Sequence, residues 1–129
     1  GCERVLVALL TEDRLELQGR IALGPGADAL CARFVFSMDG DPDDVVDAAI
    51  DSRQACRIHA ERLEGPGLER LLQVTACDEA FLAPFGTATR QIGVLYADRN
   101  GKPTDEESWR AIRHFALQAS LAVSVRSDA

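Results

Sequence analysis

Residues 81–125, FLAPFGTATRQIGVLYADRNGKPTDEESWRAIRHFALQASLAVSV, decide the fold of this chain. Apolar residues occupy both alternating faces of Phe81–Phe85 and Ile92–Ala97, which is typical of strands covered on both sides of a sheet. A Gly/Pro turn follows. Thr104 and Glu107 then form the Thr-x-x-Glu pattern of a capping box, which predicts a helix that begins at Thr104. Two strands followed by one long helix predict a packing unit in which the helix covers the strand pair.

The predicted terminal helix carries two apolar faces. The broad face should cover the sheet and consists, at helical spacing, of Trp109, Ile112, Phe115, Ala116, Ala119, Ala122 and Val123. The second face is a narrow stripe of Leu117, Leu121 and Val125, at positions that a free surface helix would leave polar. We therefore expect a missing helix or a partner chain to cover this stripe, and we predict a homodimer interface at these three residues.

The sequence before this unit predicts a strand hairpin and a less regular middle region. The expected elements are a buried strand at 4–10, a half-buried strand at 15–23, a short helix at 42–52 and a short strand at 55–59. Residues 27–38 show preferences for both helix and strand. Within the later strands, Pro84 suits a strand edge or bulge, and Gly93 should allow the close approach of another backbone.

The acidic run around residue 40 matches a calcium-binding loop at some positions only. Asp39, Asp41 and Asp43 match the first, third and fifth loop positions of an EF-hand. The sixth position requires glycine and the twelfth glutamate, whereas this chain has Asp44 and Ile50 there. The run is better explained as the acidic start of a helix, so we predict no metal site.

Composition narrows the class of protein. The chain has 129 residues, enough for one domain with a substantial core, and a formal net charge of −7. This charge disfavours nucleic acid and anionic membranes as partners. No apolar run reaches the roughly 18 to 20 residues of a membrane span, and no signal segment opens the chain. The four cysteines, Cys2, Cys31, Cys56 and Cys77, form no CxxC pair and are expected to be reduced thiols in a cytoplasmic protein.

Three segments carry a resemblance to a known family. FLAPF at 81–85, IGVLYADR at 92–99 and FALQASLAV at 115–123 resemble the C-terminal half of a GAF domain, and Arg4–Leu10 looks like the first strand of that family. The whole pattern is most similar to GAF domains found beside HDOD domains in bacterial signalling proteins. The resemblance implies an α/β fold of the α+β type. It would have a central antiparallel sheet of about five to six strands, the C-terminal helix on one face, and variable loops and short helices on the other.

The resemblance also implies a domain boundary and a ligand site. Residues 1–129 are expected to be a single GAF-like domain from a longer signalling protein, without the N-terminal helix of many relatives. GAF domains typically hold ligands on the sheet face opposite the terminal helix. The side chains predicted to bind such a ligand are Arg33, Phe34, Phe36, His59, Phe81, Phe85 and Tyr96. This set suits a small anionic or aromatic molecule. The alternative is that the aromatic rings simply fill the core.

The expected function is that of a regulatory sensor domain. It would bind an unidentified small molecule, dimerise through its terminal helix, or do both, and pass a signal to a neighbouring domain. The alternative is a ligand-free dimerisation module. A less favoured alternative is the GAF-fold free methionine-R-sulfoxide reductase, which uses a thiolate nucleophile and a resolving cysteine, because Ala76–Asp78 resembles a segment of that family. The following EAFLAPF lacks the usual continuation, and no close pair of cysteines occurs upstream. We predict no catalytic residue, and the sequence indicates no particular cofactor.

Overall fold

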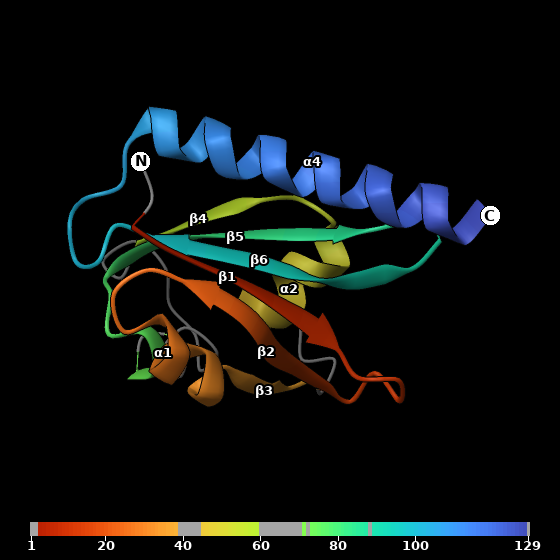
Figure 1. The fold of residues 1–129 in the computed structure, drawn as a ribbon, viewed down its shortest axis with the longest axis horizontal. Coiled ribbons are helices and arrows are strands. Elements are labelled where there is room, and N and C mark those ends of the chain that lie inside the picture. Colours follow the sequence, from red (N-terminus) through yellow and green to blue (C-terminus); the bar gives the residue numbers. More distant parts are fainter. Residues whose placement is uncertain (1–2, 39–44, 60–70, 72, 88, 129) are drawn as a thin grey trace.

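A six-stranded antiparallel sheet forms the centre of the protein. The computed structural model describes residues 3–38, 45–59, 71, 73–87 and 89–128. The strands are β1 (Arg4–Leu10), β2 (Glu16–Leu23), β3 (Val35–Ser37), β4 (Cys56–His59), β5 (Glu79–Gly86) and β6 (Gln91–Asp98). They lie in the order β3-β2-β1-β6-β5-β4 (Figure 1). The expected antiparallel sheet is therefore confirmed. The strands predicted in the N-terminal hairpin and just before the terminal helix are confirmed as well.

The middle of the sheet joins the two ends of the sequence. Strand β1 pairs with β6, so that Arg4 lies opposite Asp98 and Leu9 opposite Gly93. A Cβ atom on Gly93 would lie 2.0 Å from the carbonyl oxygen of Ala8. The expected close backbone approach at Gly93 is thus confirmed, because no larger residue fits between these strands.

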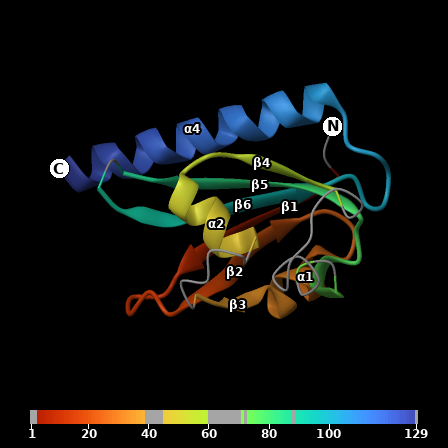
Figure 2. The same ribbon diagram turned by 180° about the vertical axis from the view of Figure 1, so that it is seen from behind.

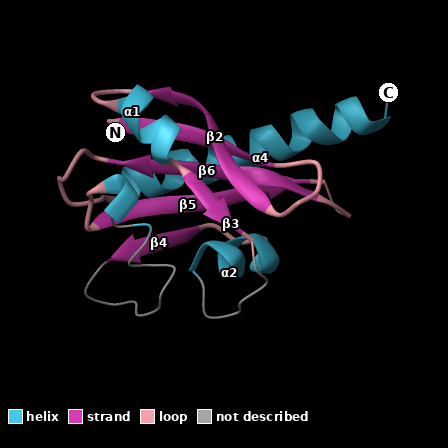
Figure 3. Ribbon diagram, turned by 90° about the horizontal axis from the view of Figure 1, so that it is seen from below, coloured by secondary structure: helices cyan, strands magenta, loops and turns pink. Residues whose placement is uncertain are grey.

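Helices cover the two faces of the sheet unequally. On one face lie α1 (Ala27–Arg33) and α2 (Val45–Ser52), and on the other lies the long helix α4 (Glu106–Asp128) (Figures 1 and 2). The view in Figure 3 shows α1, β3 and α2 on the near side of the sheet, with α4 behind it. The core on the α1/α2 face is built around Leu6, Leu17, Phe34, Leu82, Val94 and Tyr96. The core on the α4 face is built around Phe81, Ala83, Phe85, Leu95, Ile112 and Ala116.

The middle region agrees in part with the expectation. The predicted helix at 42–52 is present as α2, which begins at Val45. Residues 39–44 lie outside the described residues, and with them the acidic run that was compared with a calcium loop. The segment at 27–38, which showed preferences for both helix and strand, contains one of each: α1 ends at Arg33 and β3 begins at Val35.

Two expectations for the terminal helix are corrected. The helix begins at Glu106 rather than Thr104, because the Asp105 carboxylate accepts a hydrogen bond from the Ser108 backbone N–H at 2.7 Å and acts as the N-cap. Thr104 instead donates its hydroxyl hydrogen to Glu79 at 3.1 Å.

The broad apolar face of the helix is also narrower than predicted, since Phe115 is 58% exposed. Helix α4 packs mainly on β5 and less on β6, so the side of the helix that carries Phe115 is left uncovered.

Candidate functional site

The predicted ligand-binding residues lie in separate parts of the molecule. Phe34, Phe36 and Tyr96 pack together in the core of the α1/α2 face, with ring centroids 4.9 Å apart for Phe34–Phe36 and 5.6 Å for Phe34–Tyr96. Phe81 and Phe85 lie on the opposite face, under α4. These five rings therefore contribute to two different cores.

The two polar members of the predicted set lie nearer the surface. Arg33, at the end of α1, is exposed and donates a hydrogen bond to the Val74 carbonyl at 3.4 Å. His59, at the end of β4, has its Nε2 atom 3.9 Å from Glu79 Oε1. The structure thus does not bring all seven residues into one site, and their role in ligand binding stays a prediction.

A buried ionic network, which the sequence analysis missed, joins β1 to β6. The Arg4 guanidinium donates to both carboxylate oxygens of Asp98, with a shortest distance of 2.6 Å, and Asp98 has no exposed surface. The Tyr96 hydroxyl donates to the same carboxylate at 2.6 Å, and the Asn100 backbone N–H does so at 2.8 Å. Arg4 also donates to the Thr75 carbonyl at 2.7 Å. The carboxylate therefore has donors from three sides.

These contacts decide the protonation of the network. Burial alone would raise the pKa of Asp98, but the hydrogen bonds from Arg4, Tyr96 and Asn100 outweigh it and lower the pKa below its usual value. Burial raises the pKa of the Tyr96 hydroxyl well above its usual range, and the Asp98 charge raises it further. At neutral pH the network thus contains an ionised Asp98, a charged Arg4 and a neutral Tyr96.

The sequence contained one signal of this network. Arg4 is the only charged residue in the strand RVLVALL, and Asp98 follows the apolar run of β6. The turn that follows the strand predicts only a turn-capping role for Asp98, and its bond to the Asn100 N–H is of that kind. The ion pair depends on the register of β1 against β6, which no local pattern indicates.

Cys77 touches the same network but lacks the character of a nucleophile. Its Sγ atom is 3.1 Å from Arg4 Nη2, and the residue is buried. Burial raises the pKa of the Cys77 thiol, and the neighbouring Asp98 charge adds to that effect more than Arg4 offsets it. A reactive cysteine needs a lowered pKa and exposure, and Cys77 has neither.

Among the described residues, no cluster of three or more His, Cys, Asp or Glu side chains is arranged to hold a metal ion.

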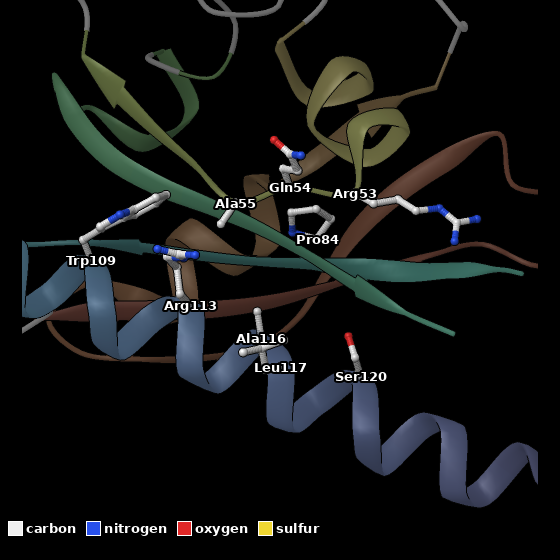
Figure 4. Close-up of a pocket in the computed structure, with 9 residues that line it drawn as sticks. All are labelled: Arg53, Gln54, Ala55, Pro84, Trp109, Arg113, Ala116, Leu117 and Ser120. Atoms are coloured by element: carbon white, nitrogen blue, oxygen red, sulfur yellow. The ribbon is translucent and has the colours of Figure 1, made fainter. Parts of the chain in front are cut away.

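A pocket of about 580 Å³ lies between α4 and the segment that leads into β4. We call it the α4 pocket. Its lining, drawn in Figure 4, consists of Arg53, Gln54, Ala55, Pro84, Trp109, Arg113, Ala116, Leu117 and Ser120. The pocket exists because β4 pairs with β5 only as far as Leu82, so that Pro84 has no strand beside it on that edge. This confirms the expected position of Pro84 at a strand edge.

The aromatic residue of the α4 pocket is held between two neighbours. Trp109 stacks on Phe81 with ring centroids 5.4 Å apart. The Arg113 guanidinium lies over the Trp109 ring, 5.6 Å from its centre. On the same helix, the Ser120 hydroxyl oxygen accepts a hydrogen bond from the Gly86 backbone N–H at 3.1 Å. These contacts fix helix α4 against β5 and give the pocket defined walls.

The predicted dimer residues lie on the outer side of α4. Leu117 is 66% exposed and Leu121 is 67% exposed. The third residue, Val125, lies in α4, but its side chain is outside the part of the structure that is described.

Over the described residues, no helix combines the length and the apolar character needed to cross a bilayer.

Comparison with known proteins identifies the fold. No protein-family model and no curated protein sequence matches the chain. Among solved structures, residues 122–287 of a methyl-accepting chemotaxis protein match 98% of this chain over 79% of their own length, with 25% identity and a TM-score of 0.71. The GAF-B domain of DevS from Mycobacterium smegmatis matches 99% of this chain over 84% of its own length, with 24% identity and a TM-score of 0.68.

An enzyme shares the same architecture. The type II free methionine-R-sulfoxide reductase from Thermoplasma acidophilum matches 95% of this chain over 79% of its own length, with 12% identity and a TM-score of 0.63. At this identity the match concerns the fold alone, which supports different functions. The sheet order, the position of α4 and these matches together show that the chain has the α+β fold of GAF domains.

Proposed function

We propose that this chain is the regulatory sensor domain of a cytoplasmic bacterial signalling protein, and that it pairs with a second copy through α4. The observation that carries the proposal is the pair of leucines on the outer face of that helix. Leu117 and Leu121 are both about two-thirds exposed, one helical turn apart, while Ile112 and Ala116 on the inner face are buried. An apolar outer face on a helix that already packs on a sheet is suited to a partner helix.

The fold supports the regulatory part of the proposal. GAF-like structures similar to this chain include parts of a chemotaxis protein and of DevS. The placement beside an HDOD domain is the narrower part of the proposal and rests on the sequence resemblance. In such a protein, helix α4 would pass a change in the domain to its neighbour.

A second uncovered apolar surface fits the expected N-terminal helix. Ile21 is 64% exposed and Leu23 71% exposed, opposite Val7 and Val5 of β1 on the same sheet face as α4. Phe115 of α4 is a further exposed apolar residue. We propose that a helix before β1 in the whole protein covers these residues.

Two versions of the sensor role remain. In the first, a small anionic or aromatic molecule binds at the α1/α2 face near Arg33 and His59. In the second, the α1/α2 face holds no ligand and the domain serves as a dimerisation module. The dense packing of Phe34, Phe36 and Tyr96 in the core favours the second version. Thermal-shift measurements with a metabolite set distinguish the two, because only a ligand-binding domain gains stability at saturating ligand.

Sedimentation equilibrium tests the dimer. We expect the wild type to form a dimer and Leu121→Glu to be monomeric, since a buried carboxylate at the helix interface is costly. Gln118→Glu is the matched control, because Gln118 is also exposed on α4 but lies outside the apolar stripe. Circular dichroism would show that both variants remain folded. A monomeric wild type, or equal dimerisation of all three proteins, would refute the proposed interface.

A further inference from the structure

We propose that the α4 pocket binds a small organic carboxylate that has an apolar or aromatic body. Nine residues line the pocket, and its volume of about 580 Å³ is within the range of small-molecule sites. It lies on the α4 face of the sheet, opposite Phe34, Phe36 and Tyr96. Phe81 and Phe85 are on the α4 face as well, but none of the seven residues that the sequence predicted to bind a ligand lines the pocket. The proposal therefore concerns a site separate from the predicted one, and this site shares Leu117 with the proposed dimer interface.

The charge of the lining selects an anion. Arg53 and Arg113 both line the pocket, and the described lining residues include no carboxylate. Arg53 also lines an adjoining pocket of about 550 Å³, whose other charged residues are Arg14, Arg90 and one carboxylate, Asp51. Arginines thus gather at this end of a protein whose net charge is −7. Such a local concentration of positive charge attracts anions despite the overall charge.

Arg113 is positioned to recognise a carboxylate. Its contact with the Trp109 ring holds the guanidinium at the wall of the pocket. A guanidinium that lies over a ring keeps the N–H donors in its own plane available to another partner. Arginine and carboxylate match in geometry, because two parallel N–H groups can bind the two oxygens.

The rest of the lining suits an apolar body with few polar groups. Ala55, Pro84, Ala116 and Leu117 supply apolar surface, and Trp109 adds an aromatic edge (Figure 4). Two neutral polar side chains complete the lining, Gln54 and Ser120. The Ser120 oxygen accepts the Gly86 N–H, and that bond leaves the hydroxyl hydrogen available to donate to an anion.

The position of the pocket gives binding a direct effect on α4. Five lining residues belong to this helix, and Leu117 lines the pocket and also belongs to the outer apolar stripe. A ligand that contacts both Arg113 and Gln54 would connect α4 with the segment at 53–55. Occupancy would therefore change the position or the rigidity of the helix that is exposed to partners.

Tryptophan fluorescence tests the proposal directly. Trp109 is the single tryptophan of the chain, so its emission reports on this pocket without labelling. Titration with phenylacetate should produce a saturable change in emission. Phenylacetamide has the same body without the charge and should bind at least about tenfold more weakly, since hydrogen bonds between charged groups are the stronger ones. Inorganic phosphate, which lacks the body, should also bind more weakly.

Two variants locate the binding. Arg113→Gln should weaken phenylacetate binding by about tenfold or more, because it removes the charged donor. Arg110→Gln is the matched control, because Arg110 is exposed on the same helix but does not line the pocket. Retained helix content by circular dichroism shows that the variants fold. No saturable change in the wild type, equal binding of phenylacetamide, or equal weakening by both variants would overturn the proposal.

Discussion

The Asp98 carboxylate and the Arg4 guanidinium meet inside the protein at 2.6 Å, although 94 positions separate them in the sequence. The two residues lie opposite each other, Arg4 in β1 and Asp98 in β6. Through the Tyr96 hydroxyl, the same carboxylate reaches the core of the α1/α2 face. The ion pair therefore fixes the register of the two central strands and connects their ends to the core.

Asp98→Asn should lower the free energy of unfolding by about 3–5 kcal/mol, because it leaves the Arg4 charge buried without its partner. Urea denaturation measures this change. Glu106→Gln is the control, since it breaks the exposed Arg57–Glu106 pair and should cost at most about 1 kcal/mol. Equal effects of the two substitutions would mean that the buried pair contributes no more than a surface pair.

The lowered pKa of Asp98 predicts a loss of stability in acid. The unfolded chain, with an ordinary pKa near 3.8, takes up this proton at a higher pH than the folded protein does. The stabilisation is therefore complete at neutral pH and is lost as the pH falls below about 3.8 and through the folded pKa. Urea midpoints measured from neutral pH down to about pH 3 should fall more steeply for the wild type than for Asp98→Asn. Asp13 and Asp105, whose pKa values are also lowered, are present in both proteins and cancel in this comparison. Parallel curves would contradict the prediction.

Cys77 should react slowly with thiol reagents. Burial raises the pKa of its thiol, so the reactive thiolate is scarce at neutral pH, whereas Cys31 is partly exposed. Maleimide labelling followed by peptide mass spectrometry should show Cys31 modified before Cys77 in the folded protein, and both modified together in denaturant. For the same reason we expect no turnover of free methionine-R-sulfoxide by the purified protein. Rapid labelling of Cys77, or turnover that is lost in Cys77→Ser, would restore the reductase alternative.

Local patterns were sufficient for most of the fold and insufficient for the sites. Apolar residues on both faces identified β1 and β6. Most of β6 is buried on both sides, whereas β1 is buried on one side and half-buried on the other. The Arg4–Asp98 pair depends on which strands are neighbours, and the α4 pocket depends on where β4 begins; both features arise only on folding. Helical spacing predicts Phe115 in the core, yet it is exposed, because such spacing gives the faces of a helix but not the width of the surface that it covers.

The N-cap of α4 is another feature that the local sequence pattern did not determine. Thr104 and Asp105 are both good capping residues, and the structure uses Asp105, because Thr104 is bonded to Glu79. Asp105→Ala should therefore lower the free energy of unfolding by about 1 kcal/mol, as measured by urea denaturation. Asp105 also forms an ion pair with Arg99 at 3.1 Å, so Asp105→Asn is needed as the control. Asparagine keeps the capping oxygen and loses the charge, and this variant should remain close to the wild type. If asparagine were as costly as alanine, the charge of Asp105 rather than its capping bond would stabilise the helix.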